Sequence, residues 1–241
     1  MNVLDLTLPS PAENLACDEA LLDWCEENNG DEILRFWESP QPFVVVGYAN
    51  KVATEVNAPA CEARGIPILR RCSGGGTVLQ GRGCLSYALI LKVAENSPTA
   101  SISGANRFIM ERNRDAIQSI IGSEQTVSIR GCTDLTVDDV KFSGNSQRRR
   151  KHYLLFHGTF LWDYDLAMIG EVLRMPSQQP DYRKDRRHLD FISNAKLMPE
   201  QIKGALMDVW KAKTALQNPP MEKIAALARD KYSAREWNYK F

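Results

Sequence analysis

The sequence has no excess of charge of either sign, because 30 basic residues balance 30 acidic ones along its 241 positions. A strongly positive surface, the usual electrostatic mark of a nucleic-acid-binding protein, is therefore not expected. No apolar stretch approaches the roughly 20 residues that a helix needs to cross a bilayer. Residues 1–10 contain no basic cluster and no long apolar run, so they do not form a signal peptide. We expect neither a nucleic-acid partner nor a membrane partner.

Metal-binding and disulfide patterns are also missing. The six cysteines, at positions 17, 25, 61, 72, 84 and 132, never form a Cys-x-x-Cys pair. Scattered cysteines without an export signal indicate reduced thiols in the cytoplasm. No two Cys or His residues at ligand spacing are followed by a second such pair, so no protein-bound metal is expected.

The hydrophobic pattern predicts a single α/β (α+β) domain over residues 1–241, with a mixed, largely antiparallel central sheet flanked by helices. The sequence Ser10-Pro11-Ala12-Glu13 provides a capping box and a first-turn proline for a helix over 10–27. Further helices are predicted at 103–121, 199–213 and 220–232. Strands are predicted at 32–37, 43–47, 66–71, 77–80, 84–93, 133–137, 140–142 and 153–162.

Residues 70–77, Arg-Arg-Cys-Ser-Gly-Gly-Gly-Thr, form a predicted glycine-rich turn between two strands. Glycine lets a ligand approach the backbone N–H groups closely, and the two arginines supply fixed positive charge. This combination suits a carboxylate or a phosphate, although a plain flexible turn is the alternative. The segment is neither a Walker loop nor a Rossmann fingerprint, because the spacing and the final residues differ.

Residues 140–146, Val-Lys-Phe-Ser-Gly-Asn-Ser, place Lys141 on the opposite side of a strand from Val140 and Phe142. A lone lysine on a strand usually belongs to a solvated face. The Ser-Gly-Asn-Ser turn expected directly behind Lys141 favours a binding role instead, in which the ammonium stabilises charge on a carboxylate or phosphate.

Two other residues allow two interpretations each. His157 lies in an apolar strand, which is typical of a satisfied core histidine, but Gly158 permits close approach of a ligand. Cys132 is, taken alone, an ordinary buried thiol. A nucleophilic role for Cys132 would require a lowered pKa, for which Arg130 and Lys141 are the candidate positive charges.

The basic run at 148–151 is typical of a solvated turn, and it could also steer an acidic partner. The polar segment at 176–187 is predicted to be a long loop, and loops of this length are often functional or mobile.

Together these segments resemble the biotin/lipoate ligase superfamily, and specifically the lipoate–protein ligases. The resemblance covers nearly the whole chain in order, and a biotin ligase is less well matched. It implies Lys141 as the catalytic residue. It also implies a lipoate- or adenylate-binding set of Arg70, Arg71, Ser73, Gly74, Gly75, Gly76, Thr77, Val78, Ser143, Gly144, Asn145, His157, Gly158 and Thr159.

By this resemblance, ATP with Mg²⁺ and lipoate or octanoate give an acyl-adenylate. The acyl group then passes to a lysine of a lipoyl carrier domain, as found in 2-oxoacid dehydrogenases or glycine cleavage proteins. The chain ends at Phe241 without the small C-terminal accessory domain of many such ligases, so it works alone or with a separate accessory chain.

Two alternatives stay open. Related octanoyltransferases form a thioester on a cysteine in the loop before the family lysine, and Cys132 lies in a comparable place. The enzyme would then move the acyl group from a carrier protein without ATP. The other alternative is a non-catalytic protein that only binds lipoate or a lipoyl domain.

Overall fold

The computed structural model describes residues 1–241. The helices are α1 Pro11–Asn28, α2 Val52–Glu55, α3 Ala58–Ala63, η1 Pro98–Ala100, α4 Ile102–Ile121, α5 Leu166–Val172, η2 Asp181–Arg183, α6 His188–Phe191, α7 Pro199–Trp210, α8 Met221–Leu227, η3 Ala228–Tyr232 and α9 Arg235–Asn238. The strands are β1 Asn2–Asp5, β2 Ile33–Trp37, β3 Phe43–Val46, β4 Ile68–Arg70, β5 Val78–Gln80, β6 Cys84–Lys92, β7 Val127–Arg130, β8 Asp134–Val137, β9 Val140–Arg149, β10 Tyr153–Leu161 and β11 Thr214–Ala215.

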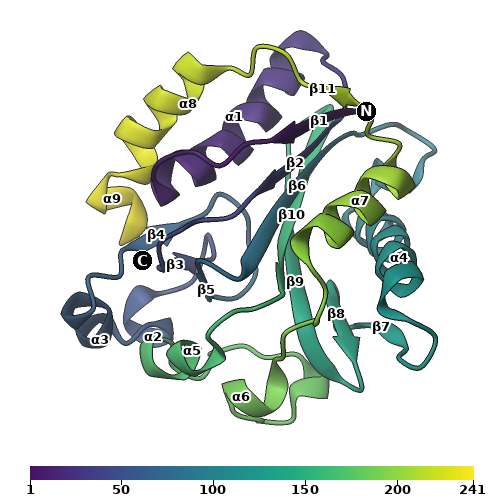
Figure 1. Cartoon of the computed structure of the whole chain (residues 1–241). Helices are drawn as coiled ribbons and strands as arrows, with labels where there is room; N and C mark the ends of the chain where they lie inside the picture. Colours follow the sequence, from purple (N-terminus) through teal and green to yellow (C-terminus); the bar gives the residue numbers. More distant parts are fainter.

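The strands form two sheets (Figure 1). The larger has eight strands in the order β11-β1-β2-β6-β10-β9-β8-β7, and the smaller has three in the order β4-β3-β5. In the large sheet β1 pairs in parallel with β2 and β11, while the other pairings are antiparallel. The predicted mixed, largely antiparallel sheet with flanking helices is confirmed.

Helices cover both faces of the large sheet, and the alternation of side chains along β2 shows how. Leu34 and Phe36 join the apolar cluster that contains residues of α4 and α7. Ile33 and Trp37 point the other way, into the cluster built on α1 and α8. Strand β2 therefore has apolar side chains on both faces, with Arg35 as its one charged residue, because both faces are covered.

Local signals in the sequence located several elements correctly. The capping box of Ser10 and Glu13 begins α1. The predicted hairpin turns at Asp138 and Asp139, both of which have positive φ, as a tight two-residue turn between twisted strands requires.

The turn predicted at residues 143–146 is wrong. Strand β9 continues through these residues to Arg149, because Gly144 pairs with Thr159 of β10 and Ser146 pairs with His157. The segment 176–187 is largely irregular, as predicted, apart from the short helix η2.

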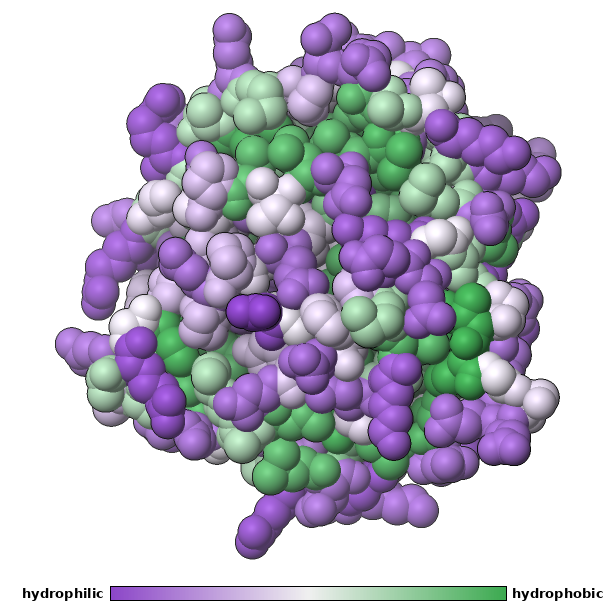
Figure 2. Space-filling view, in the orientation of Figure 1, coloured by the Kyte–Doolittle hydropathy of each residue, from purple (hydrophilic) through white to green (hydrophobic).

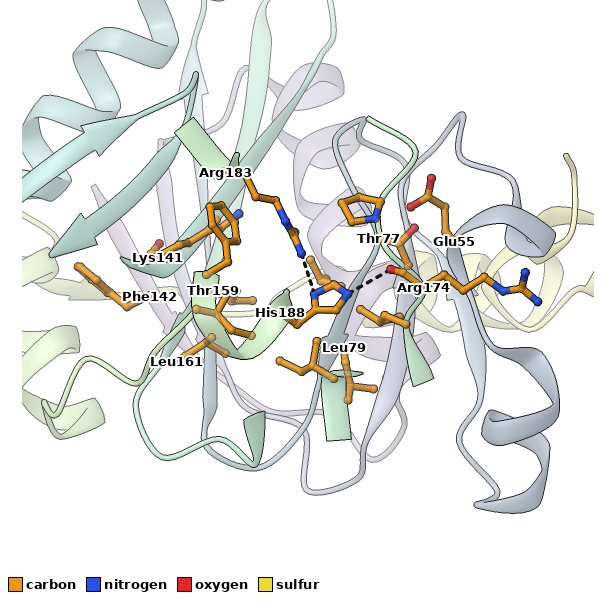
Figure 3. Close-up of a pocket in the computed structure, with 18 residues that line it drawn as sticks. Glu55, Thr77, Leu79, Lys141, Phe142, Thr159, Leu161, Arg174, Arg183 and His188 are labelled. Atoms are coloured by element: carbon orange, nitrogen blue, oxygen red, sulfur yellow. Dashed lines mark hydrogen bonds between the residues drawn. The ribbon is translucent and has the colours of Figure 1, made fainter. Parts of the chain in front are cut away.

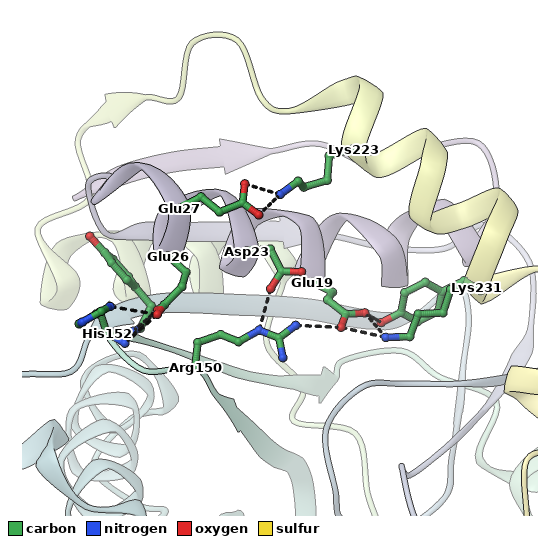
Figure 4. Close-up of polar contacts among 10 residues, drawn as sticks. Glu19, Asp23, Glu26, Glu27, Arg150, His152, Lys223 and Lys231 are labelled. Atoms are coloured by element: carbon green, nitrogen blue, oxygen red, sulfur yellow. Dashed lines mark hydrogen bonds and ion pairs between the residues drawn. The ribbon is translucent and has the colours of Figure 1, made fainter.

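The C-terminal residues pack on α1 through a polar network (Figure 4). Glu19 of α1 is buried and accepts hydrogen bonds from Lys231 Nζ at 2.6 Å and from the Tyr232 hydroxyl at 2.8 Å. Arg150 donates to Asp23 at 2.7 Å. Arg150 therefore connects the end of β9 to α1. This residue of the basic run 148–151 is not part of a solvated turn.

Hydrophilic side chains are spread over the face shown in Figure 2, with smaller hydrophobic patches between them. None of the helices combines the length and the apolar composition of a transmembrane segment.

A buried ion pair joins α1 to β2. Asp18 Oδ1 lies 2.5 Å from Arg35 Nη1, and both side chains are at most 3% exposed. Burial alone would raise the pKa of Asp18, but the charge of Arg35 and the hydrogen bond with His157 outweigh it and hold that pKa below its ordinary value.

We expect Asp18→Asn to lower the free energy of unfolding at pH 7 by about 3–5 kcal/mol, because Arg35 is left buried without a charged partner. Because the pKa of Asp18 is lower in the folded protein, Asp18 stabilises the fold fully above its unfolded-state pKa of about 3.9. This stabilisation is lost as the pH falls through the pKa of the folded state. Urea unfolding at pH 7 and in steps below pH 4 measures both effects. Asp5→Asn is the control, since Asp5 forms an exposed pair with Lys203 and should cost under about 1 kcal/mol. Equal effects of the two substitutions would contradict the assigned role.

Candidate active site

A pocket lies between β5 of the small sheet, strands β9 and β10 of the large sheet, and the segment from α5 to α6 (Figure 3). Its volume is about 110 Å³. The apolar lining consists of Val78, Leu79, Phe142, Leu161, Ile169, Leu173, Phe191 and Ile192. The polar lining includes Glu55, Thr77, Lys141, Ser143, Gly144, Thr159, Arg174, Arg183 and His188. The arrangement suits an apolar chain that ends in a negatively charged or polar group.

Lys141 is the pocket lysine that the sequence singled out. Its side chain is 24% exposed, and its Nζ lies 2.8 Å from Asp134 Oδ1 on the neighbouring strand β8. It reaches Asp134 by crossing Gly144, where an added Cβ would stand only 2.6 Å from Nζ. The glycine therefore makes room for the protein's own lysine.

The glycine-rich turn ends at Thr77, which lines this pocket. Arg71 holds the turn through hydrogen bonds. The buried guanidinium donates to the carbonyl oxygens of Gly74 at 2.5 Å and Gly76 at 2.7 Å, and to Ser73 Oγ at 3.1 Å. Burial lowers the pKa of Arg71 to about 10, so it remains charged at neutral pH. In this structure Arg71 shapes the turn, and its charge faces protein carbonyls.

Arg70 has a comparable role on the other side of its strand. Its fully buried side chain donates to the carbonyl oxygens of Gly47, Tyr48, Asn50, Trp237 and Asn238. These bonds connect β4 to the loop after β3 and to α9. The guanidinium lies away from the pocket lining.

His157 links the turn to the core. Its Nε2 lies 2.6 Å from Ser73 Oγ, and its Nδ1 lies 3.0 Å from Asp18 Oδ2. Since Asp18 can only accept, Nδ1 donates to it, and Nε2 shares a hydrogen bond with the Ser73 hydroxyl. His157 is thus the satisfied core histidine of the plain interpretation. It also stands on the same face of β10 as the pocket residue Thr159, about 7 Å along the strand.

Two further residues of the sequence set, Asn145 and Gly158, do not line the pocket, and neither does Gly75. Asn145 Nδ2 donates to Thr133 O at 2.7 Å, and Asn145 Oδ1 accepts from the Tyr87 hydroxyl at 2.6 Å. An added Cβ on Gly158 would stand 1.8 Å from that same Oδ1. Gly158 accordingly makes room for Asn145, and close approach of a ligand is not what requires glycine there.

Cys132 lies outside the pocket, exposed on the turn between β7 and β8. The buried thiol expected from the sequence is therefore wrong, because a tight turn at the sheet edge offers nothing to cover it. The two cations proposed to activate it are already paired: Arg130 with Asp139 at 2.6 Å, and Lys141 with Asp134.

The sequence missed the polar residues that the segment 174–188 brings to the pocket. His188 Nε2 donates to the carbonyl oxygen of Arg174 at 3.1 Å, and Nδ1 faces Arg183 Nη2 at 3.4 Å (Figure 3). Burial lowers the pKa of His188 below its ordinary value, which fits a neutral ring that accepts from Arg183. The only available signal was the length of this polar segment, because it has no periodicity.

Gly158→Ala should reduce the free energy of unfolding by about 1–3 kcal/mol, because the new methyl group must displace the Asn145 amide from its hydrogen bonds. Gly204→Ala in α7 is the matched control, since nothing lies within 4 Å of its added Cβ. Replacing a helical glycine there should instead stabilise the protein by about 0.5–1 kcal/mol. Thermal unfolding of both variants tests the assignment, and an unaffected Gly158→Ala protein would rule it out.

Comparison with known proteins supports the resemblance found in the sequence. The family model described as "Lipoyl protein ligase A/B catalytic domain" matches residues 10–208. Among curated relatives, octanoyltransferase LipM of Geobacillus kaustophilus is 27% identical over 263 aligned positions, which cover 95% of this chain and 94% of LipM. A probable lipoate-protein ligase A of Mycoplasma genitalium is 26% identical and covers 99% of this chain and 72% of its own length.

Solved structures show the same fold. The bi-partite lipoate protein ligase of Thermoplasma acidophilum superposes with a TM-score of 0.83 at 21% identity, covering 99% of this chain and 95% of that protein. A lipoate-protein ligase A bound with ATP gives 0.80 at 23% identity, with coverage of 99% and 98%. Because the family model spans well over half of the sequence, the chain belongs to the lipoyl protein ligase A/B catalytic domain family.

Proposed function

We propose that this protein activates lipoate or octanoate with ATP and transfers the acyl group to a lysine of a lipoyl carrier domain. The observation that carries the proposal is the place of Lys141, which lines the same pocket as Thr77 of the glycine-rich turn and eight apolar side chains. An amine held there can stabilise negative charge on a reacting carboxyl group while the apolar walls exclude water.

Each part of the pocket has a role in this proposal. The apolar side chains around Leu161 and Phe191 would bind the acyl chain. Thr77 Oγ1 is buried without a hydrogen-bond partner, so it is free to bond the ligand's polar end.

The reaction would proceed in two balanced steps. A carboxylate oxygen of the fatty acid attacks the α-phosphorus of ATP and expels pyrophosphate, which gives the acyl-adenylate. The carrier lysine then attacks the acyl carbonyl and expels AMP, with loss of one proton from the amine. Mg²⁺ would enter with the nucleotide. The use of ATP is supported by the family resemblance and by a structural relative, a lipoate-protein ligase A bound with ATP.

The second candidate is acyl transfer from a carrier protein through a Cys132 thioester, without ATP. The curated relatives named octanoyltransferase favour it. The structure supports it less well, because Cys132 lies on an exposed turn outside the pocket.

Intact-mass measurement on an apo lipoyl domain separates the candidates. One reaction contains ATP, Mg²⁺ and lipoate or octanoate, and the other contains octanoyl-acyl carrier protein without ATP. We expect a mass gain only in the first, and the same gain with Cys132→Ser. A gain only in the second, abolished by Cys132→Ser, would replace ligation with transfer. No gain in either reaction points to a non-catalytic binding protein or to a separate accessory chain, as in the bi-partite relative.

Lys141→Ala should reduce acylation by at least about a hundredfold, since one preorganised charge-stabilising group is typically worth 10²–10³ in rate. The pair that Lys141 forms with Asp134 is only 24% and 14% exposed, so thermal unfolding must accompany the assay to show that the variant is folded. The control is Lys151→Ala, an exposed lysine without an ion pair. Undiminished acylation by the Lys141 variant would remove the lysine from the mechanism.

A further inference from the structure

The segment over the pocket, residues 174–193, is bonded to the hairpin of β8 and β9 that carries Lys141. The backbone N–H of Ser193 donates to the carbonyl oxygen of Lys141 at 2.8 Å. Arg186 Nη2 donates to the carbonyl oxygen of Asp139 at 3.0 Å. A third contact connects the two elements through side chains: the Tyr182 hydroxyl donates to Asp134 Oδ2 at 2.7 Å.

Asp134 is therefore shared between the segment and the lysine. Its Oδ1 pairs with Lys141 Nζ at 2.8 Å, while its Oδ2 accepts from Tyr182. The carboxylate is 14% exposed. Because each oxygen has its own partner, the Tyr182 bond fixes the rotation of the carboxylate and with it the place of the ammonium.

Tyr182 is itself held firmly. Its ring packs against Phe191 with the centroids 5.2 Å apart, and it lies in the short helix η2. Burial, reinforced by the Asp134 carboxylate, raises the pKa of Tyr182 far above its ordinary value. The hydroxyl is therefore protonated across the working pH range and acts towards Asp134 only as a donor.

We propose that Tyr182 is a positioning residue: through its hydrogen bond to Asp134 it sets the place of the Lys141 ammonium. This inference rests on the proposed function for the role of Lys141. The proposed function by itself does not require Tyr182.

The first test needs no turnover. Limited reaction with acetic anhydride, read by peptide mass spectrometry, reports the reactivity of each lysine amine, with exposed Lys151 as the internal standard. Tyr182→Phe should raise acetylation of Lys141 several-fold, because the loosened carboxylate holds the ammonium less well. Asp134→Asn should raise it further, since the opposite charge is gone. In the Asp134→Asn background, Tyr182→Phe should have no additional effect, because the connection is already broken.

Tyr164→Phe is the matched control. Its hydroxyl is also buried but has no hydrogen-bond partner, so this substitution should leave Lys141 acetylation unchanged. Unchanged acetylation in Tyr182→Phe, or an equal increase with and without Asp134, would overturn the proposal. Thermal unfolding of each variant confirms that the comparison is between folded proteins.

Turnover supplies the second readout. Tyr182→Phe should lower kcat for carrier acylation about tenfold with little change in KM for the carrier domain, since slight misplacement of a reacting group costs 10–100-fold. If acetylation of Lys141 changes while kcat does not, Tyr182 positions the lysine only in the enzyme without substrate, and its proposed role in catalysis is overturned. If the unsubstituted protein acylates nothing while Lys141 acetylation still responds as expected, the proposed function fails and the positioning contact stands.

Discussion

The buried carboxylate of Asp18 is the interaction on which the site depends. It pairs with Arg35 of β2, accepts from His157 of β10, and through His157 reaches Ser73 at the start of the glycine-rich turn. A carboxylate at 2% exposure is tolerated only because its oxygens have charged or polar partners. One helix, two strands and the turn are therefore fixed relative to each other by a single group.

Arg70 and Arg71, at the start of the turn, are likewise buried charges with polar partners. Both were candidates for binding an anion, yet each has its guanidinium bonded to several backbone carbonyl oxygens. Placing a buried, permanently charged side chain against carbonyl dipoles satisfies the charge and fixes an irregular backbone at once. Neither guanidinium lines the pocket, whereas Lys141 and Thr77 do.

The sequence predicted what local chemistry determines: the start of α1 and the turn at Asp138 and Asp139. Only the resemblance to lipoate–protein ligases brought the lysine strand, the glycine turn and the histidine strand together. It failed where partners come from far along the chain. Residues 143–146 look like a turn, and only pairing with β10 makes them a strand. Asp134 and Tyr182 lie 48 positions apart, and no period or motif in a single sequence connects a polar loop to a hairpin.

If an acyl-adenylate forms beside Lys141, labelled pyrophosphate exchanges into ATP without any carrier domain. The exchange should require lipoate or octanoate, be lost in Lys141→Ala, and persist in Cys132→Ser. Absence of exchange in a protein that still acylates a lipoyl domain from octanoyl-acyl carrier protein would contradict formation of the adenylate and assign the chemistry to a thioester.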